Sequence, residues 1–166
     1  MNFARIARLR EKLLAAGQPS IRPPPPGPEE PLPPERGALY ARVQPLAEVM
    51  FLVMSADGAI ASDERAALLG MLRTLTDGAL SSREMAQMLD DFGEGLAREG
   101  VEQRLDTLAA RLYGEPEDRE LALALAAATV LTDEQVQPGE AAILSSLAER
   151  LGVPEARARS LIEQTE

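Results

Sequence analysis

An all-α domain is the fold class that this 166-residue sequence predicts, and two observations support the prediction. First, 45% of the residues are hydrophobic but only 3% are aromatic. Leu, Ala, Val and Met dominate, a composition that favours helices over sheets. Second, apolar residues recur at helical spacing between start and stop signals. We therefore expect a bundle of about seven helices, preceded by a short amphipathic helix and a proline-rich linker.

The first 22 residues form a basic amphipathic segment. Its apolar residues fall at helical spacing and predict a helix over 2–16: Phe3, Ile6, Leu9, Leu13 and Leu14. Residues 1–22 carry five basic side chains against one acidic side chain, a net charge of +4, so the rest of the chain carries −14. Two interpretations stay open. The helix attaches to an anionic membrane surface or an acidic partner, or it packs on its own domain or frays.

Residues 23–36 are predicted to be a linker. The stretch PPPPGPEEPLPP holds eight prolines within residues 23–34, which indicates an extended polyproline spacer. A ligand for an SH3-like or WW-like groove is the alternative interpretation.

Residues 37–166 form the predicted helical domain. Helices are expected near 38–56 (kinked or restarted at Pro45), 62–76, 81–92, 97–113, 116–131, 138–151 and 154–164. The motif SSRE predicts a capping box with Ser81 as N-cap and Glu84 at the third helical position. The helices 45–56 and 121–131 are apolar on nearly all sides, so we expect them at the centre of the bundle.

The residue inventory excludes several kinds of chemistry. The chain has no cysteine and no histidine, so it cannot form disulfides, thiolate or imidazole zinc sites, or a Ser-His-Asp triad. The net charge of −10 argues against nucleic-acid binding. Neither a secretory signal nor an apolar run of the ~20 residues that span a membrane is visible, so we expect a cytoplasmic protein. With no nucleophile or phosphate loop to point to, we expect no enzyme.

An acidic corner follows the first apolar helix. The stretch SADGAIASDE contains Asp57-Gly58 and then Glu64 at the spacing of the second half of an EF-hand calcium loop. The first ligand position, however, is Val53, so a high-affinity calcium loop is not expected. Any cation here must be held by oxygen, which favours Ca²⁺, Mg²⁺ or Mn²⁺.

The corner recurs 76 residues later. DGAIASDE aligns with DEQVQPGE, so that Asp57 pairs with Asp133 and Glu64 with Glu140. Both copies follow an apolar helix and precede an amphipathic one, which predicts two pseudo-symmetric halves. Glu134 replaces Gly58 in the second copy. The second corner therefore differs in structure or is strained if the backbone needs a positive φ at this position.

The stretches MSADGAIASDERAALLGML and TVLTDEQVQPGEAAILSSLAERLGV resemble the TerB-like family of tellurite-resistance-associated all-α domains, over about residues 38–164. The resemblance implies a helical bundle of two pseudo-symmetric halves, with acidic corners suspected of binding metal, in bacterial stress responses. Family members also occur within chaperone-related and membrane-associated proteins.

Two interpretations of the corners stay open. In the first, a divalent cation binds to acidic side chains from both corners, namely Asp57, Asp63, Glu64, Asp133, Glu134 and Glu140. In the second, the acids are structural: Asp57 and Asp133 accept backbone N–H groups in their own loops, with Ser62 helping in the first. Glu64 and Glu140 then favour the start of the helix that follows each corner. The expected function is a non-catalytic, metal-linked stress domain. The alternative is an adaptor or co-chaperone-type module whose acidic face binds a basic protein partner.

Overall fold

The computed structural model describes residues 34–58, 60–114, 116–130, 138–154, 156–158 and 160. All regular elements in this part of the chain are helices, as predicted. They are α2 (Pro34–Met54), α3 (Ser62–Leu75), α4 (Ser82–Leu112), α5 (Pro116–Val130) and α6 (Pro138–Arg150). The helix predicted over 2–16, residues 23–33 of the linker and the end of the helix predicted over 154–164 lie outside the described residues. None of the described helices is long and apolar enough to cross a membrane.

Helix α2 begins earlier than predicted and is not interrupted at Pro45. It starts at Pro34, within the predicted linker, because proline fits the first helical position, where no backbone N–H bond is needed. A proline inside a helix costs about 3 kcal/mol. Burial offsets this cost here, since neighbouring Leu46 and Ala47 are fully buried.

Helix α4 joins two segments that the sequence predicted as separate helices. The predicted break over residues 93–96 is wrong, because the chain is helical there and leaves helical geometry at Gly100 instead, with φ 79° and ψ 164°. Gly93 and Gly95 give room to side chains: a Cβ atom would lie 3.8 Å from the Phe51 ring at Gly93, and 3.5 Å from the Arg104 guanidinium at Gly95. Of these three glycines in α4, only Gly100 has a positive φ, which glycine adopts more readily than other residues.

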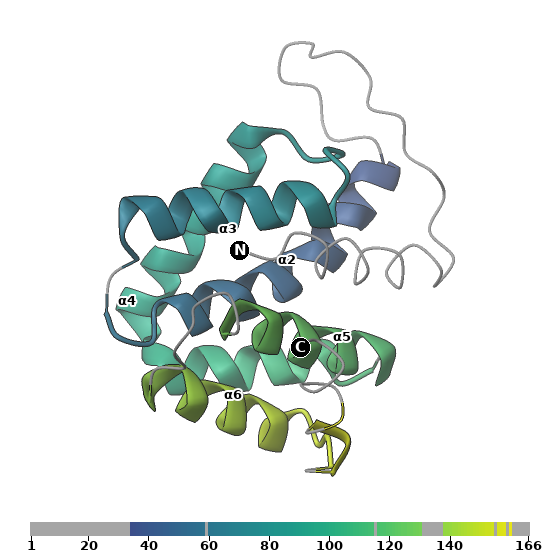
Figure 1. The fold of residues 1–166 in the computed structure, drawn as a ribbon. Coiled ribbons are helices and arrows are strands. Elements are labelled where there is room, and N and C mark those ends of the chain that lie inside the picture. Colours follow the sequence, from purple (N-terminus) through teal and green to yellow (C-terminus); the bar gives the residue numbers. More distant parts are fainter. Residues whose placement is uncertain are drawn as a thin grey trace.

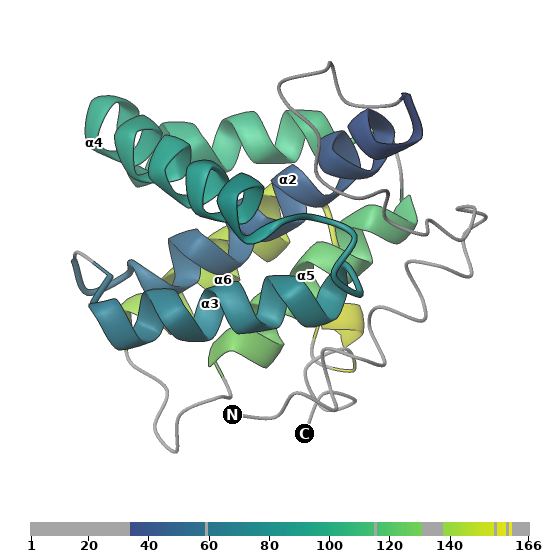
Figure 2. The same ribbon diagram turned by 90° about the horizontal axis from the view of Figure 1, so that it is seen from above.

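The core forms around α2 and α5, which make the most extensive helix contact of the described residues. Every residue from Leu121 to Val130 is buried, and so are the residues of α2 from 46 to 53. This confirms that the two apolar helices pack together at the centre. Figure 1 shows α2 between α3 on one side and α5 and α6 on the other, and Figure 2 shows α2 between α3 and the first half of α4. The approximate two-fold relation between the halves stays a prediction.

Candidate functional site

The first acidic corner joins α2 to α3 through local hydrogen bonds. The Ser55 hydroxyl donates to the Leu52 carbonyl at 3.0 Å, and the Gly58 N–H donates to the Ser55 carbonyl at 3.1 Å. Gly58 has φ 139°, so the corner does need a positive φ at this position. The Glu64 carboxylate accepts the Ala61 N–H at 2.7 Å and caps α3.

The structural role predicted for Asp57 and Ser62 is wrong. Ala61, not Ser62, is the N-cap of α3. Asp57 is exposed, and its carboxylate forms no hydrogen bond or ion pair within the described part of the chain. Asp63 is exposed as well. Glu64 lies in the first turn of α3, where the structural interpretation expects it, and its carboxylate supplies the cap.

The start of α6, which includes the last residues of the second predicted corner, lies beside the first corner. Gly139, at the start of α6, approaches so closely that a Cβ atom there would lie 3.0 Å from the Ala56 carbonyl oxygen. Figure 1 accordingly shows the α2–α3 corner and the start of α6 at the same end of the bundle. Glu140 is half-buried in the first turn of α6, while Asp133 and Glu134 lie outside the described residues.

The described residues do not by themselves form a cation site. Among them, no group of three or more acidic side chains is close enough to hold a metal ion. Glu64 already binds the Ala61 N–H, which leaves Asp57 and Asp63 as the exposed acids of the first corner. Ca²⁺ takes six to eight oxygen ligands, so most would have to come from elsewhere.

A cleft of about 530 Å³ opens between the first corner, the start of α3 and the middle of α4. Most of its lining is apolar or glycine: Phe51, Gly58, Ile60, Leu89, Gly93, Leu96 and Ala97. Its polar lining residues are Ser55, Arg65, Asp90 and Glu94. The size and the mostly apolar surface are typical of ligand sites in proteins.

The rim of this cleft carries acidic groups without a basic partner. Arg65 donates to Asp90 at 2.7 Å and to the Ala86 carbonyl at 3.2 Å. Glu94 is exposed on α4, and its carboxylate, like that of Asp57 in the adjoining corner, makes no ion pair with any described residue. The rim is therefore net negative and can form further ion pairs with a cationic ligand.

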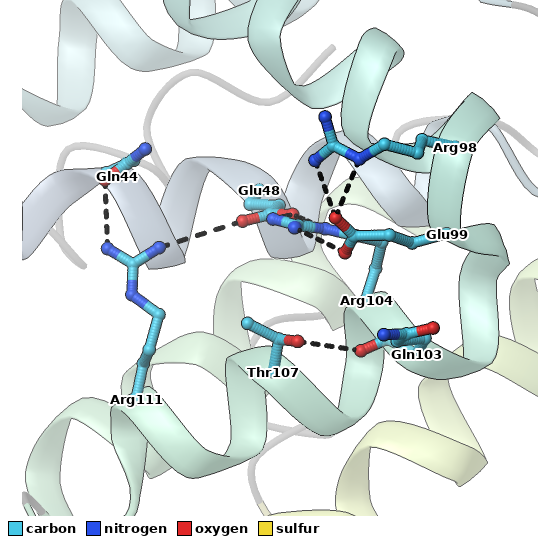
Figure 3. Close-up of polar contacts among 8 residues, drawn as sticks. All are labelled: Gln44, Glu48, Arg98, Glu99, Gln103, Arg104, Thr107 and Arg111. Carbon is cyan, nitrogen blue, oxygen red and sulfur yellow. Dashed lines mark hydrogen bonds and ion pairs between the residues drawn. The ribbon is translucent and has the colours of Figure 1, made fainter.

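Helix α2, which contributes Phe51 to the cleft, also carries a buried carboxylate. Glu48 is 1% exposed, and its Oε1 accepts hydrogen bonds from Nε of Arg104 at 2.6 Å and from Nη2 of the same guanidinium. Arg104 also donates to Glu99 at 2.9 Å, on the other side of the Gly100 break. Figure 3 shows that Arg104 connects both halves of α4 to α2.

The second oxygen of Glu48 has no hydrogen-bond partner among the described residues, and Nη1 of Arg111 lies 4.0 Å from it. Burial raises the pKa of Glu48, while the hydrogen bonds and charge of Arg104 and the charge of Arg111 oppose the increase. Glu48 is not among the candidate residues predicted from the sequence. A signal was present, because Glu48 is the single charged residue between positions 43 and 56.

Comparison with known proteins identifies the family of this helical domain. The model of the family described as "Tellurite resistance protein TerB" matches residues 44–162, most of the chain. The chain therefore belongs to the TerB family, and the resemblance inferred from the two corners is confirmed. No curated protein and no solved structure matches the chain.

Proposed function

We propose that this TerB-family chain is a non-catalytic binding domain that holds a cationic, partly apolar protein segment in the cleft beside its first corner. The cleft itself carries the proposal, because it combines an apolar lining with acidic rim groups that have no basic partner among the described residues. A helix with an apolar stripe and basic flanks satisfies both features. No cysteine or histidine is available for nucleophilic or general-base catalysis, which supports the non-catalytic role.

A display library of 16-residue helical peptides, selected on the immobilised full chain, tests this function. The selected peptides should carry Lys or Arg beside an apolar stripe. Their binding should be lost in Ala97→Arg, which places a bulky cation at the cleft wall. Ala110→Arg is the matched control, because Ala110 is an exposed alanine on the same helix outside the cleft. Equal binding to both variants would contradict the proposal.

A divalent cation bound between the two corners is the second candidate. It is supported by the contact of Gly139 with Ala56, which brings the start of α6, where Glu140 lies, against the first corner. The ligands would come from the six predicted acids, including Asp133 and Glu134. Ca²⁺ or Mn²⁺ at 100 times its dissociation constant should stabilise the fold by about 2.7 kcal/mol. An unchanged melting temperature for the full chain in millimolar Ca²⁺ and Mn²⁺ would reject this candidate.

The link to tellurite resistance or another stress response is proposed from family membership alone. Deletion of the gene followed by growth on tellurite tests it. The Ala97→Arg and Ala110→Arg chains, expressed in the deletion strain, would show whether the cleft contributes to any resistance.

A further inference from the structure

The cleft matches a segment of the same chain. The predicted helix over 2–16 has apolar residues on one stripe, among them Phe3, Ile6 and Leu9, and basic residues between them. The cleft offers an apolar lining of similar character, together with acidic side chains that form no ion pair within the described part of the chain. These are the two chemical features that the proposed function requires of a ligand, so this inference rests on that function.

Charge complementarity favours this occupant. Residues 1–22 have a net charge of +4 in a chain whose remainder is −14. Asp57 and Glu94 are exposed at the corner and the cleft rim, and neither carboxylate has a basic partner among the described residues. An amphipathic basic helix would place Arg5, Arg8 or Lys12 near these carboxylates while its apolar stripe enters the cleft.

The connecting chain is long enough. The described chain begins at Pro34, and Phe51 at the cleft lies 17 positions further along α2, about 26 Å away at 1.5 Å per residue. Residues 17–33 connect the predicted helix to Pro34. At about 3.1 Å per residue, an extended proline-rich segment of this length spans roughly 53 Å. The linker thus reaches the cleft with about twice the required length.

We propose that residues 2–16 dock as a helix in this cleft of their own chain and compete there with external ligands. The tether gives the segment an effective concentration of about 1 mM. With an intrinsic dissociation constant of about 100 µM, the segment would fill the cleft some ten times more often than leave it empty. External peptides would then bind about tenfold more weakly than to a free cleft. The N-terminal segment is, on this inference, an autoinhibitor of the domain.

A spin label tests the docking directly. Because the chain has no cysteine, Ala4→Cys gives a single attachment site for a nitroxide on the full-length protein. The label should broaden the amide resonances of Ser55, Ile60 and Ala97, which line the cleft, and should spare Ser146 on α6. Absence of broadening at the cleft, or broadening centred elsewhere, would overturn the proposal.

Matched variants and a mixing experiment separate the alternatives. Leu9→Asp should abolish the broadening, whereas Leu32→Asp in the linker should not. Glu94→Lys should weaken it, and Glu149→Lys, at an exposed acid on α6, should leave it unchanged. Chains that carry the nitroxide but no ¹⁵N can be mixed with ¹⁵N chains that carry no nitroxide. This mixture should show no broadening. Broadening in that mixture would assign the occupant to a second copy.

The peptide ligands distinguish a failure of this inference from a failure of the proposed function. They should bind the Leu9→Asp chain about tenfold more tightly than the wild type if the segment competes for the cleft. Equal, Ala97-dependent binding to both chains would overturn autoinhibition and leave the binding function standing. If no peptide depends on Ala97 in either chain, the binding function fails, and the spin label alone then decides whether the segment docks.

Discussion

Replacing Arg104 by methionine should be among the most damaging single changes in this protein. Arg104 supplies both hydrogen bonds that the buried Glu48 carboxylate receives. Methionine keeps the apolar stem but removes the charge and leaves Glu48, 1% exposed, with no hydrogen bond among the described residues. Breaking a buried ion pair in this way costs about 3–5 kcal/mol. That is a large part of the 5–15 kcal/mol that stabilises a typical domain.

The cost should depend on pH, because protonated Glu48 needs no charged partner. Burial already raises the pKa of Glu48 above its ordinary value near 4.5, and loss of Arg104 removes a group that opposes this increase. A raised folded-state pKa means that the contribution of Glu48 to stability is full below about 4.5 and is lost as pH rises through the folded pKa. The Arg104→Met deficit should therefore be larger at pH 7 than at pH 5.

Urea unfolding of three variants at both pH values measures these effects. The pair replacement Glu48→Met with Arg104→Met should recover most of the loss, because no charge remains buried. Arg98→Met is the matched control: it removes another arginine partner of Glu99, but one that is 71% exposed, and should cost about 0.5 kcal/mol or less. A single Arg104→Met variant that loses under 1 kcal/mol at pH 7, or a pair as unstable as the single variant, would refute this reasoning.

Three further predictions concern the corners and caps. Glu64→Ala should lose about 1 kcal/mol of unfolding free energy, measured in urea with chelator present, because the Glu64 carboxylate caps α3. Asp57→Ala should stay within about 0.5 kcal/mol of the wild type. A larger loss for Asp57→Ala than for Glu64→Ala would contradict the described corner. Burial raises the pKa of Glu84, but hydrogen bonds from Ser81 and Arg36 outweigh burial and leave the pKa below its ordinary value of 4.5. The free energy of unfolding that wild type gains over Glu84→Gln should therefore be largest above pH 4.5 and should decrease on acidification. A difference that does not change with pH would exclude this linkage. Gly139→Ala should lower the melting temperature, because the added Cβ atom would press on the Ala56 carbonyl. Gly37→Ala is the control, because Gly37 on α2 faces open space, and it should leave the melting temperature unchanged. Equal effects of the two substitutions would argue against the close contact.

Local signals in the sequence predicted the helices and several of their starts. The Ser81–Glu84 capping box is present, with the Ser81 N–H donating to Glu84 at 2.7 Å and the Glu84 N–H donating to Ser81 at 3.2 Å. These signals act within one turn of helix, so the sequence displays them directly. The central position of α2 and α5 was equally visible, because an all-round apolar helix has no polar face to turn toward solvent.

The misses depend on contacts between residues that are distant in the chain. The break predicted over residues 93–96 contains Gly93 and Gly95, but these glycines face Phe51 and Arg104, whose approach the local pattern cannot show. The cleft likewise arises where the first corner meets the middle of α4, some 30 residues later. Only the packing of the helices reveals such a site.

The isolated position of α3 has a consequence for how the molecule opens. Among the described helices, α3 packs mainly on α2 and α4, and its two ends are short turns, the second of which holds Asp77 and Gly78 at φ 53° and φ 72°. An element with few neighbours detaches at a lower free energy than the core, so amide hydrogens of α3 should exchange faster than those of α2 and α5. Since Arg65 at the start of α3 lines the cleft and is bonded to Asp90 of α4 there, detachment of this helix would also open the cleft to a ligand. Residence time in the cleft would then follow the opening rate of a single helix.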